Sequence, residues 1–359
     1  MQALQLFPAS YVVPYLYQKH NPMTIFDDHA RFTDSLFDEN LQDQTIEFES
    51  EIDFLFNAIK DYRKSKKFRD IIDFCNRFNH IAPFNAMLIN MQRPGSRLAL
   101  TAKEWINQYG RALKPNAQPL IYLNHTPVGA MYDISDTISL DGRSDQEIIE
   151  EVAHPFKGEG SFDVELLNNI VANLEYYGIA HDFEFNASER YGAYIQQRVV
   201  LHKVKFNRYG IAGEFMYPMP YFVSINKDAD DLQRMQSLCH ELGHFFCHHL
   251  PPASPEWWVK RRHDITIREF EAEITSYMVC KRNGIPCPRS ETYLAHYVEE
   301  NDEIPRNISV ETIMKAVSAI EKMMEPMSWS EGLLYKNDSL FKKRLQEERD
   351  KIDRRAGRA

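Results

Sequence analysis

Two segments in the second half of the chain place apolar residues at helical spacing. Residues 232–250, LQRMQSLCHELGHFFCHHL, contain no proline, and their apolar side chains recur every three or four positions. Residues 267–280, IREFEAEITSYMVC, show similar spacing although they include three glutamates. An apolar stripe of this period is typical of a helix that packs one face against a core. We therefore predict two packed helices, with Glu269 lying 25 residues after His244.

Helical and strand patterns occur in both halves of the chain, which predicts an α+β fold. A chain of 359 residues is long enough for about two domains. We place the boundary within 139–163, and expect an N-terminal domain over 41–145 and a C-terminal domain with a small sheet over 160–359. Residues 1–40 remain unassigned. Further predicted elements are helices over 44–79, 162–177, 310–324 and 339–353, strands over 119–123, 130–134, 181–185, 192–199 and 200–206, and an edge strand over 221–225.

The first of the two helices contains a His-Glu-x-x-His motif, formed by His240, Glu241 and His244. Positions i and i+4 of a helix lie one above the other, so both imidazoles project from one face with room for a divalent ion. Glu241 lies one residue further round, where its carboxylate can take a proton from a water that a zinc ion activates. This pattern predicts a zinc-dependent peptidase with Glu241 as its catalytic base.

A catalytic zinc site needs a third protein ligand and an open fourth position. Leu250 stands where one subclass of these enzymes has a third histidine, which excludes that subclass. On the second helix, Glu269 and Glu273 are four residues apart and share a face, whereas Glu271 points elsewhere. A carboxylate pair on a packed helix needs a partner. His248 and His249 could also touch the site, although packing or capping at the helix end is the simpler expectation.

Three stretches together resemble the ImmA/IrrE-like metallopeptidases and other gluzincins. They are Met219–Asn226, the motif at Cys239–His244, and Glu269–Glu273 with its alanine at the fourth position. The resemblance implies that His240, His244 and Glu269 bind zinc, that Glu241 is the general base, and that Glu273 orients a ligand histidine. The family more often has Asp or Asn at the position of Glu273, so Glu273 remains an alternative third ligand.

Charge is distributed unevenly along the chain. The whole sequence has a formal net charge of -10, which argues against a general polyanion binder. Residues 60–115, however, contain twelve Lys or Arg and four Asp or Glu, a net charge of +8, with Trp105 and Tyr109 among them. Basic groups and aromatics in one groove are typical of single-stranded nucleic acid binding. Composition alone favours the alternative, a solvated helix face with Trp105 in the core.

The same region resembles the N-terminal domain of ArdC-type antirestriction proteins. The shared positions are Phe84, Asn85, Leu88, Ile89, Gln92, Pro94, Thr101, Trp105, Gly110, Arg111, Tyr132, Asp133, Ser135 and Thr137. The resemblance implies a domain that binds single-stranded DNA ahead of a metallopeptidase domain. The family usually has Lys-Gly-Glu where this chain reads Lys114–Ala117. The candidate DNA-binding residues are Lys64, Lys66, Lys67, Arg93, Arg97, Trp105, Tyr109, Arg111 and Lys114.

Cysteine usage and hydropathy complete the prediction. Five unpatterned cysteines, after a start that shows no signal-peptide pattern, indicate reduced thiols in the cytoplasm. No apolar run approaches the roughly 18 residues that would span a membrane. We therefore expect a cytoplasmic, zinc-dependent, ArdC-like protein with single-stranded DNA and a protein or peptide as partners, acting in counter-defence or DNA-associated proteolysis. Two alternatives stay open: a regulatory peptidase that cleaves a repressor, and a non-catalytic DNA-binding or occluding protein with a structural metal.

Overall fold

The computed structural model describes residues 53, 56, 60–123, 128–153, 162–185, 193–255, 257–258, 261 and 264–358. The chain divides into two compact units, Met1–Lys157 and Gly158–Ala359, and both combine helices with small sheets. The segment 1–40 lies outside the described residues. Within them, none of the helices has the length and apolar character needed to cross a membrane.

Two packed helices open the described part of the first unit. A 3-10 turn, η2 (Lys60–Arg63), precedes α5 (Ser65–Arg77), and α6 (Pro83–Gln92) packs against α5. Much of the helix predicted over 44–79 lies outside the described residues. In the described part, α5 buries one face through Phe68, Ile71, Ile72, Phe74 and Cys75, so its exposed face carries the lysines.

Two small antiparallel sheets follow in the first unit. Strands β1 (Ala99–Leu100), β4 (Gly129–Asp133) and β3 (Leu120–Tyr122) pair in that order, and β2 (Arg111–Leu113) pairs with β5 (Thr137–Ser139). The short helix η3 (Ile134–Asp136) joins β4 to β5. Strand β3 lies within the predicted stretch 119–123, and β4 overlaps the predicted stretch 130–134 but begins and ends one residue earlier.

A tryptophan-centred core holds the rest of this unit together. Trp105 lies on α7 (Ala102–Tyr109), and it is fully buried with Leu98, Leu100, Ile134 and Ile148. Its indole Nε1 donates to the carbonyl of Tyr132 at 2.8 Å. Ile148 belongs to α8 (Asp145–Ala153), a helix that begins where the predicted N-terminal domain ends. The core therefore continues past residue 145.

The second unit contains a three-stranded sheet of order β6-β8-β7. Strand β7 (Ala193–Arg208) pairs with β8 (Ile211–Asn226) as a long antiparallel hairpin, and β6 (Ile179–Phe185) runs parallel to β8. The two strands predicted over 192–199 and 200–206 are one strand with a register shift between Gln197 and Val200. The prediction of an edge strand over 221–225 is wrong, because β8 is paired on both sides.

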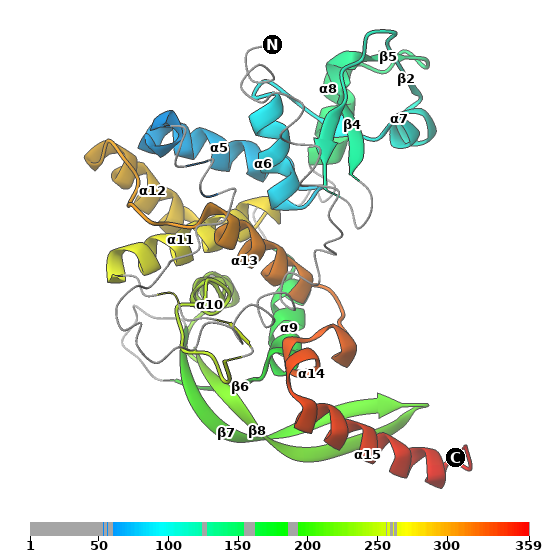
Figure 1. The fold of residues 1–359 in the computed structure, drawn as a ribbon, viewed down its shortest axis with the longest axis vertical. Helices are drawn as coiled ribbons and strands as arrows, with labels where there is room; N and C mark the ends of the chain where they lie inside the picture. The colour runs from blue at the N-terminus through cyan, green and yellow to red at the C-terminus, as the bar shows by residue number, and fades with distance from the viewer. Residues whose placement is uncertain are drawn as a thin grey trace, which may run out of the picture. The chain divides into compact units, whose positions relative to one another are not determined.

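Helices cover this sheet and continue to the end of the chain. They are α9 (Val164–Asn173) with the turn η4 (Leu174–Tyr177), α10 (Asp231–Phe246), α11 (Ile265–Arg282), α12 (Pro288–Glu300), α13 (Val310–Met323), η5 (Trp329–Glu331), α14 (Leu333–Asn337) and α15 (Ser339–Arg355). Helices α10, α11 and α13 pack on one another, and α15 lies along the hairpin (Figure 1). The ring of Phe341 on α15 packs against those of Phe215, in a tilted arrangement, and Tyr217, edge to face, on β8.

Helices α10 and α11 approach each other closely at Gly243. A Cβ atom added to Gly243 would lie 3.0 Å from both the Cα and the carbonyl oxygen of Ala272, closer than atoms normally pack. Both obstructing atoms belong to the α11 backbone, so a side chain at Gly243 cannot be accommodated by a rotamer change. The absence of a side chain at this position therefore sets the separation of the two helices.

We predict that Gly243→Val lowers the free energy of unfolding of the second unit by about 1–3 kcal/mol, the range for overpacking a core. Denaturant unfolding followed by circular dichroism measures the change. Gln233→Val, at an exposed position of the same helix, controls for the presence of valine in α10. Glycine has a lower helix propensity than valine, so propensity alone would not destabilise the Gly243→Val protein. Equal effects from the two substitutions would show that close packing at Gly243 is not limiting.

Candidate metal centre

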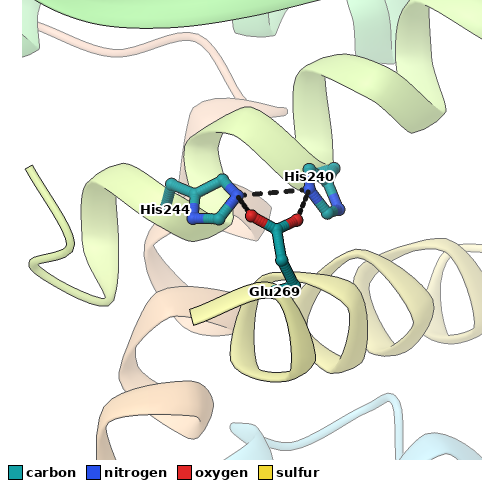
Figure 2. Close-up of side chains that lie close together, drawn as sticks. All are labelled: His240, His244 and Glu269. Atoms are coloured by element: carbon teal, nitrogen blue, oxygen red, sulfur yellow. Dashed lines mark hydrogen bonds and ion pairs between the residues drawn. The ribbon is translucent and has the colours of Figure 1, made fainter. Parts of the chain in front are cut away.

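The histidines of the motif are positioned by a capped helix. Asp230 accepts a hydrogen bond from the backbone nitrogen of Gln233 and fixes the start of α10, and Asp264 does the same for α11 through Ile267. His240 and His244 are one turn apart on α10. Their rings project toward α11, which presents the carboxylate of Glu269 (Figure 2).

Four ligand atoms converge between the two helices. The Nε2 atoms of His240 and His244 are 3.2 Å apart. The Glu269 carboxylate lies 3.4 Å from the His240 Nε2 through one oxygen and 3.5 Å from the His244 Nε2 through the other. Zinc bonds of about 2.1 Å in a tetrahedron separate neighbouring ligand atoms by about 3.4 Å. The three residues therefore fit a zinc ion with little rearrangement, and Glu269 is half exposed.

Glu273 approaches His240 from the opposite ring nitrogen. Its Oε2 lies 3.0 Å from the His240 Nδ1, on the far side of the imidazole from the converging Nε2 atoms. A carboxylate in this position fixes the tautomer that leaves Nε2 free to bind a metal. The geometry therefore favours Glu269 over Glu273 as the third ligand, with Glu273 as its support.

The electrostatic environment favours a positive charge at this point. Burial lowers the pKa of His240, but hydrogen bonds to Glu269 and Glu273 outweigh it and raise the pKa to about 10. Burial and the nearby charge of His240 lower the pKa of His244 to about 4. His240 is therefore the more basic of the two imidazoles, and the carboxylates of Glu269 and Glu273 face it.

Glu241 lies on α10 beside the ligands and contacts the sheet. Its Oε2 accepts a hydrogen bond from the backbone nitrogen of Ile195 at 3.0 Å. Ile195 belongs to β7, which is an edge strand among the described residues. Burial raises the pKa of Glu241 to about 7, and the charge of His240 opposes this rise only in part. A carboxylate with such a pKa is suited to accept a proton near neutral pH.

His249 touches the site, as the sequence allowed, and it links the site to Glu271, which residue spacing did not predict. The chain leaves α10 through His248, whose φ of 61° is left-handed, and the backbone nitrogen of His249 donates to the carbonyl of His244 at 3.0 Å. This turn brings the Nδ1 of His249 to 2.9 Å from the Nδ1 of His244. His249 contacts Glu271 through its other nitrogen at 2.9 Å. Residue spacing could not reveal this arrangement, because it depends on one backbone turn.

Glu271 is a fully buried carboxylate with four donors. Arg261 donates to both of its oxygens, at 2.6 and 2.8 Å, and the backbone nitrogen of Ser309 donates to Oε1 at 2.7 Å. His249 is the fourth donor. Burial alone would raise the pKa of Glu271, but the hydrogen bonds from His249 and Arg261 hold it below its usual value. The sequence predicted that Glu271 points away from Glu269 and Glu273. It did not predict that Glu271 is linked to the site through His249.

Comparison with protein families places this centre in a known context. Residues 189–280 match the peptidase M78 family, described as the IrrE N-terminal-like domain. The match spans all of β7, β8 and α10, and α11 as far as Cys280, so it includes the His-Glu-x-x-His motif and the glutamates at 269, 271 and 273. This part of the chain is similar to an IrrE/ImmA-like peptidase domain. Comparisons with curated proteins and with solved structures find no significant match.

The candidate DNA-binding residues of the first unit fall into two groups. Lys64, Lys66 and Lys67 are exposed at the start of α5. The second group consists of four basic residues with these partners in the unit: Arg93 pairs with Asp136, Arg97 and Arg111 both pair with Asp145, and the Nζ of Lys114 donates to the carbonyl of Ser135. Arg111 is buried. The second group therefore joins segments of the fold.

The aromatic candidates also serve the core. Trp105 is fully buried, so the prediction that it stacks on a base is corrected: its ring would have to leave the core to do so. Tyr109 is half-buried and contacts the edge of Trp105, with the ring centroids 5.9 Å apart. The alternative interpretation of the composition placed Trp105 in the core, and this is where the structure has it.

We predict that Trp105→Ala lowers the free energy of unfolding of the first unit by about 3–5 kcal/mol, the usual cost of removing a buried aromatic ring. Ile106→Ala, at a neighbouring position that is 45% exposed, should change it by less than about 0.5 kcal/mol. Thermal and denaturant unfolding measure both. A Trp105→Ala protein of wild-type stability would contradict the core assignment.

Proposed function

We propose that the second unit is a zinc-dependent peptidase whose metal is bound by His240, His244 and Glu269. The observation that carries this proposal is the convergence of three ligand groups at separations of 3.2 to 3.5 Å, beside the partly buried Glu241. A bound zinc ion would supply Lewis acidity, which polarises a carbonyl and makes water nucleophilic near neutral pH. The match to the IrrE N-terminal-like domain supports the same class of reaction.

Glu241 acts as the general base in this proposal. The Ile195 amide holds one oxygen of its carboxylate at 3.0 Å, and the other oxygen accepts the proton of the attacking water. Glu241 then returns the proton to the amine that leaves. The raised pKa of about 7 suits both transfers, because a group must lose its proton as readily as it gains it.

The substrate of this proposal is an extended peptide segment. Strand β7 is paired only with β8 among the described residues, so its outer edge offers backbone donors and acceptors. An extended peptide can add to such an edge by main-chain hydrogen bonds. The contact between Ile195 and Glu241 places the catalytic base at the same edge, next to the bond to be cleaved.

We predict that Glu241→Gln retains one zinc per chain and the wild-type fold but loses peptide hydrolysis, because glutamine cannot accept the proton. His244→Ala should release the zinc. Elemental analysis of the purified proteins and cleavage of a peptide library measure the two properties. Loss of zinc from Glu241→Gln, or full zinc content in His244→Ala, would contradict these assignments.

We further propose that the first unit binds single-stranded DNA through the exposed lysines of α5. The observation in favour is that Lys64, Lys66 and Lys67 lie together at the exposed start of this helix, in a segment of net charge +8. Phosphates are bound by such charges without base readout. Together with the ArdC-like motifs, this supports a cytoplasmic role in counter-defence or DNA-associated proteolysis. All five cysteines are free and buried, which fits a reducing compartment.

For this second proposal we predict that Lys66→Gln with Lys67→Gln weakens binding to a mixed-sequence single strand. The slope of log affinity against log salt should become shallower by about 1.4, at about 0.7 for each phosphate that the protein no longer neutralises. The matched control, Lys342→Gln with Lys343→Gln in α15, removes the same charge from the second unit and should leave the slope unchanged. Fluorescence titration at several salt concentrations measures both; no binding by the wild type at low salt would end the proposal.

The two alternatives predict different results in these experiments. A repressor-cleaving regulatory peptidase would hydrolyse a peptide but fail to bind DNA. A non-catalytic binding protein would bind DNA, and its Glu241→Gln variant would bind equally well. Its wild-type form would not hydrolyse any peptide. The geometry of Glu241 at the β7 edge favours a catalytic role, because a structural metal needs no base beside it.

A further inference from the structure

The contacts behind His244 form a continuous chain that the proposed reaction does not use. The chain runs from His244 Nδ1 to His249 Nδ1, from His249 Nε2 to Glu271, and from Glu271 to Arg261. His249 and Glu271 are almost completely buried. This chain of contacts starts at Nδ1 of His244, the ring nitrogen opposite the converging Nε2 atom. It can therefore orient the His244 ring without occupying the candidate metal position.

Only one arrangement of protons satisfies this chain and leaves His244 able to bind a metal through Nε2. His244 must then carry its proton on Nδ1 and donate it. His249 must accept at Nδ1, so its proton is on Nε2, where it donates to Glu271. Glu271 remains a carboxylate because Arg261 and the Ser309 amide donate to it as well. The position of the proton on each residue therefore determines its position on the next residue.

We propose that His249 and Glu271 are positioning residues that hold His244 in the tautomer and ring orientation needed for a metal ligand. This inference rests on the proposed zinc site. His240 receives the equivalent support directly from the carboxylate of Glu273. His244 receives it through an inserted imidazole, and the carboxylate that terminates the chain is anchored by a guanidinium.

A second metal site at Cys247, His249 and Glu271 is the competing explanation, since their ligand atoms also lie within 4.8 Å of one another. The contacts argue against it. Arg261 already occupies both oxygens of Glu271, and its positive charge would oppose a cation. Burial raises the pKa of the Cys247 thiol, and its Sγ contacts Thr275, so the thiolate that a metal needs is disfavoured.

The test compares zinc affinity in full-length variants, measured by competition with a fluorescent chelator at fixed pH. His249→Phe keeps the ring volume but removes the acceptor, and it should raise the zinc Kd by about 10- to 100-fold, as loss of a supporting hydrogen bond does in metal sites. His249→Asn places an oxygen near the position of the Nδ1 it replaces and should recover part of the affinity. A purely structural role would change the unfolding midpoint of the metal-free protein without changing the zinc Kd.

His248→Asn is the matched control. His248 is the neighbouring residue, its ring stacks on Trp258 and contacts no proposed ligand in the described structure, and asparagine tolerates its positive φ. The zinc Kd of this variant should equal that of the wild type. An unchanged Kd in His249→Phe would overturn the positioning role alone, whereas a wild type that binds no zinc would overturn the proposed function.

Nitrogen-15 spectra of the histidines cover the case in which His249→Phe fails to fold. In the zinc-loaded wild type, His249 should be neutral, with an unprotonated Nδ1 and a protonated Nε2. The opposite tautomer, or a doubly protonated His249, would exclude the proposed chain of donors and overturn the inference.

Discussion

The close contact of α10 with α11 at Gly243 is the constraint on which the candidate metal centre depends. The two histidines come from one helix and the carboxylate from the other, so their convergence requires a small separation between the helix axes. Gly243 lies between His240 and His244 in sequence, and the α11 backbone at Ala272 fills the space that its side chain would occupy. Glu269 and Glu273 are within one turn of Ala272 and are carried toward the histidines by this contact.

Two sets of charged side chains surround that contact, one partly exposed and one buried. Near the ligands, Glu269 and Glu273 face His240 and favour a positive charge there. Further inside, Glu271 compensates Arg261 and joins α11 to the start of α13 through Ser309. An unpaired carboxylate at this depth would be strongly destabilising, whereas one with four donors can remain ionised. The acidic residues at 269, 271 and 273 therefore have three different environments although they alternate along one helix.

Helix geometry explains which parts of the site could be predicted from the sequence. Residues four apart on a helix share a face whatever surrounds them, so the placement of His240 and His244, and of Glu269 and Glu273, follows from spacing. His249 reaches the site only because His248 adopts a left-handed conformation, and no spacing rule contains that turn. The position of β8 at the sheet centre depends on the parallel pairing of β6, which is a long-range contact. A tryptophan among basic residues, such as Trp105, gives the same sequence pattern whether it lies in a core or on a binding surface. Only the packing in the structure distinguishes these two locations.

The hydrogen bond from Ile195 to Glu241 means that the site has two mechanical supports. The helix pair holds the proposed ligands, and the sheet holds the proposed base, Glu241, through β7. A small shift of the hairpin relative to α10 would change the direction of proton transfer and leave the ligand separations as they are. In the proposed enzyme, turnover and metal affinity can therefore vary independently. Substitutions in the hairpin, which is distant in sequence from the motif, would change the rate without changing the ligand separations.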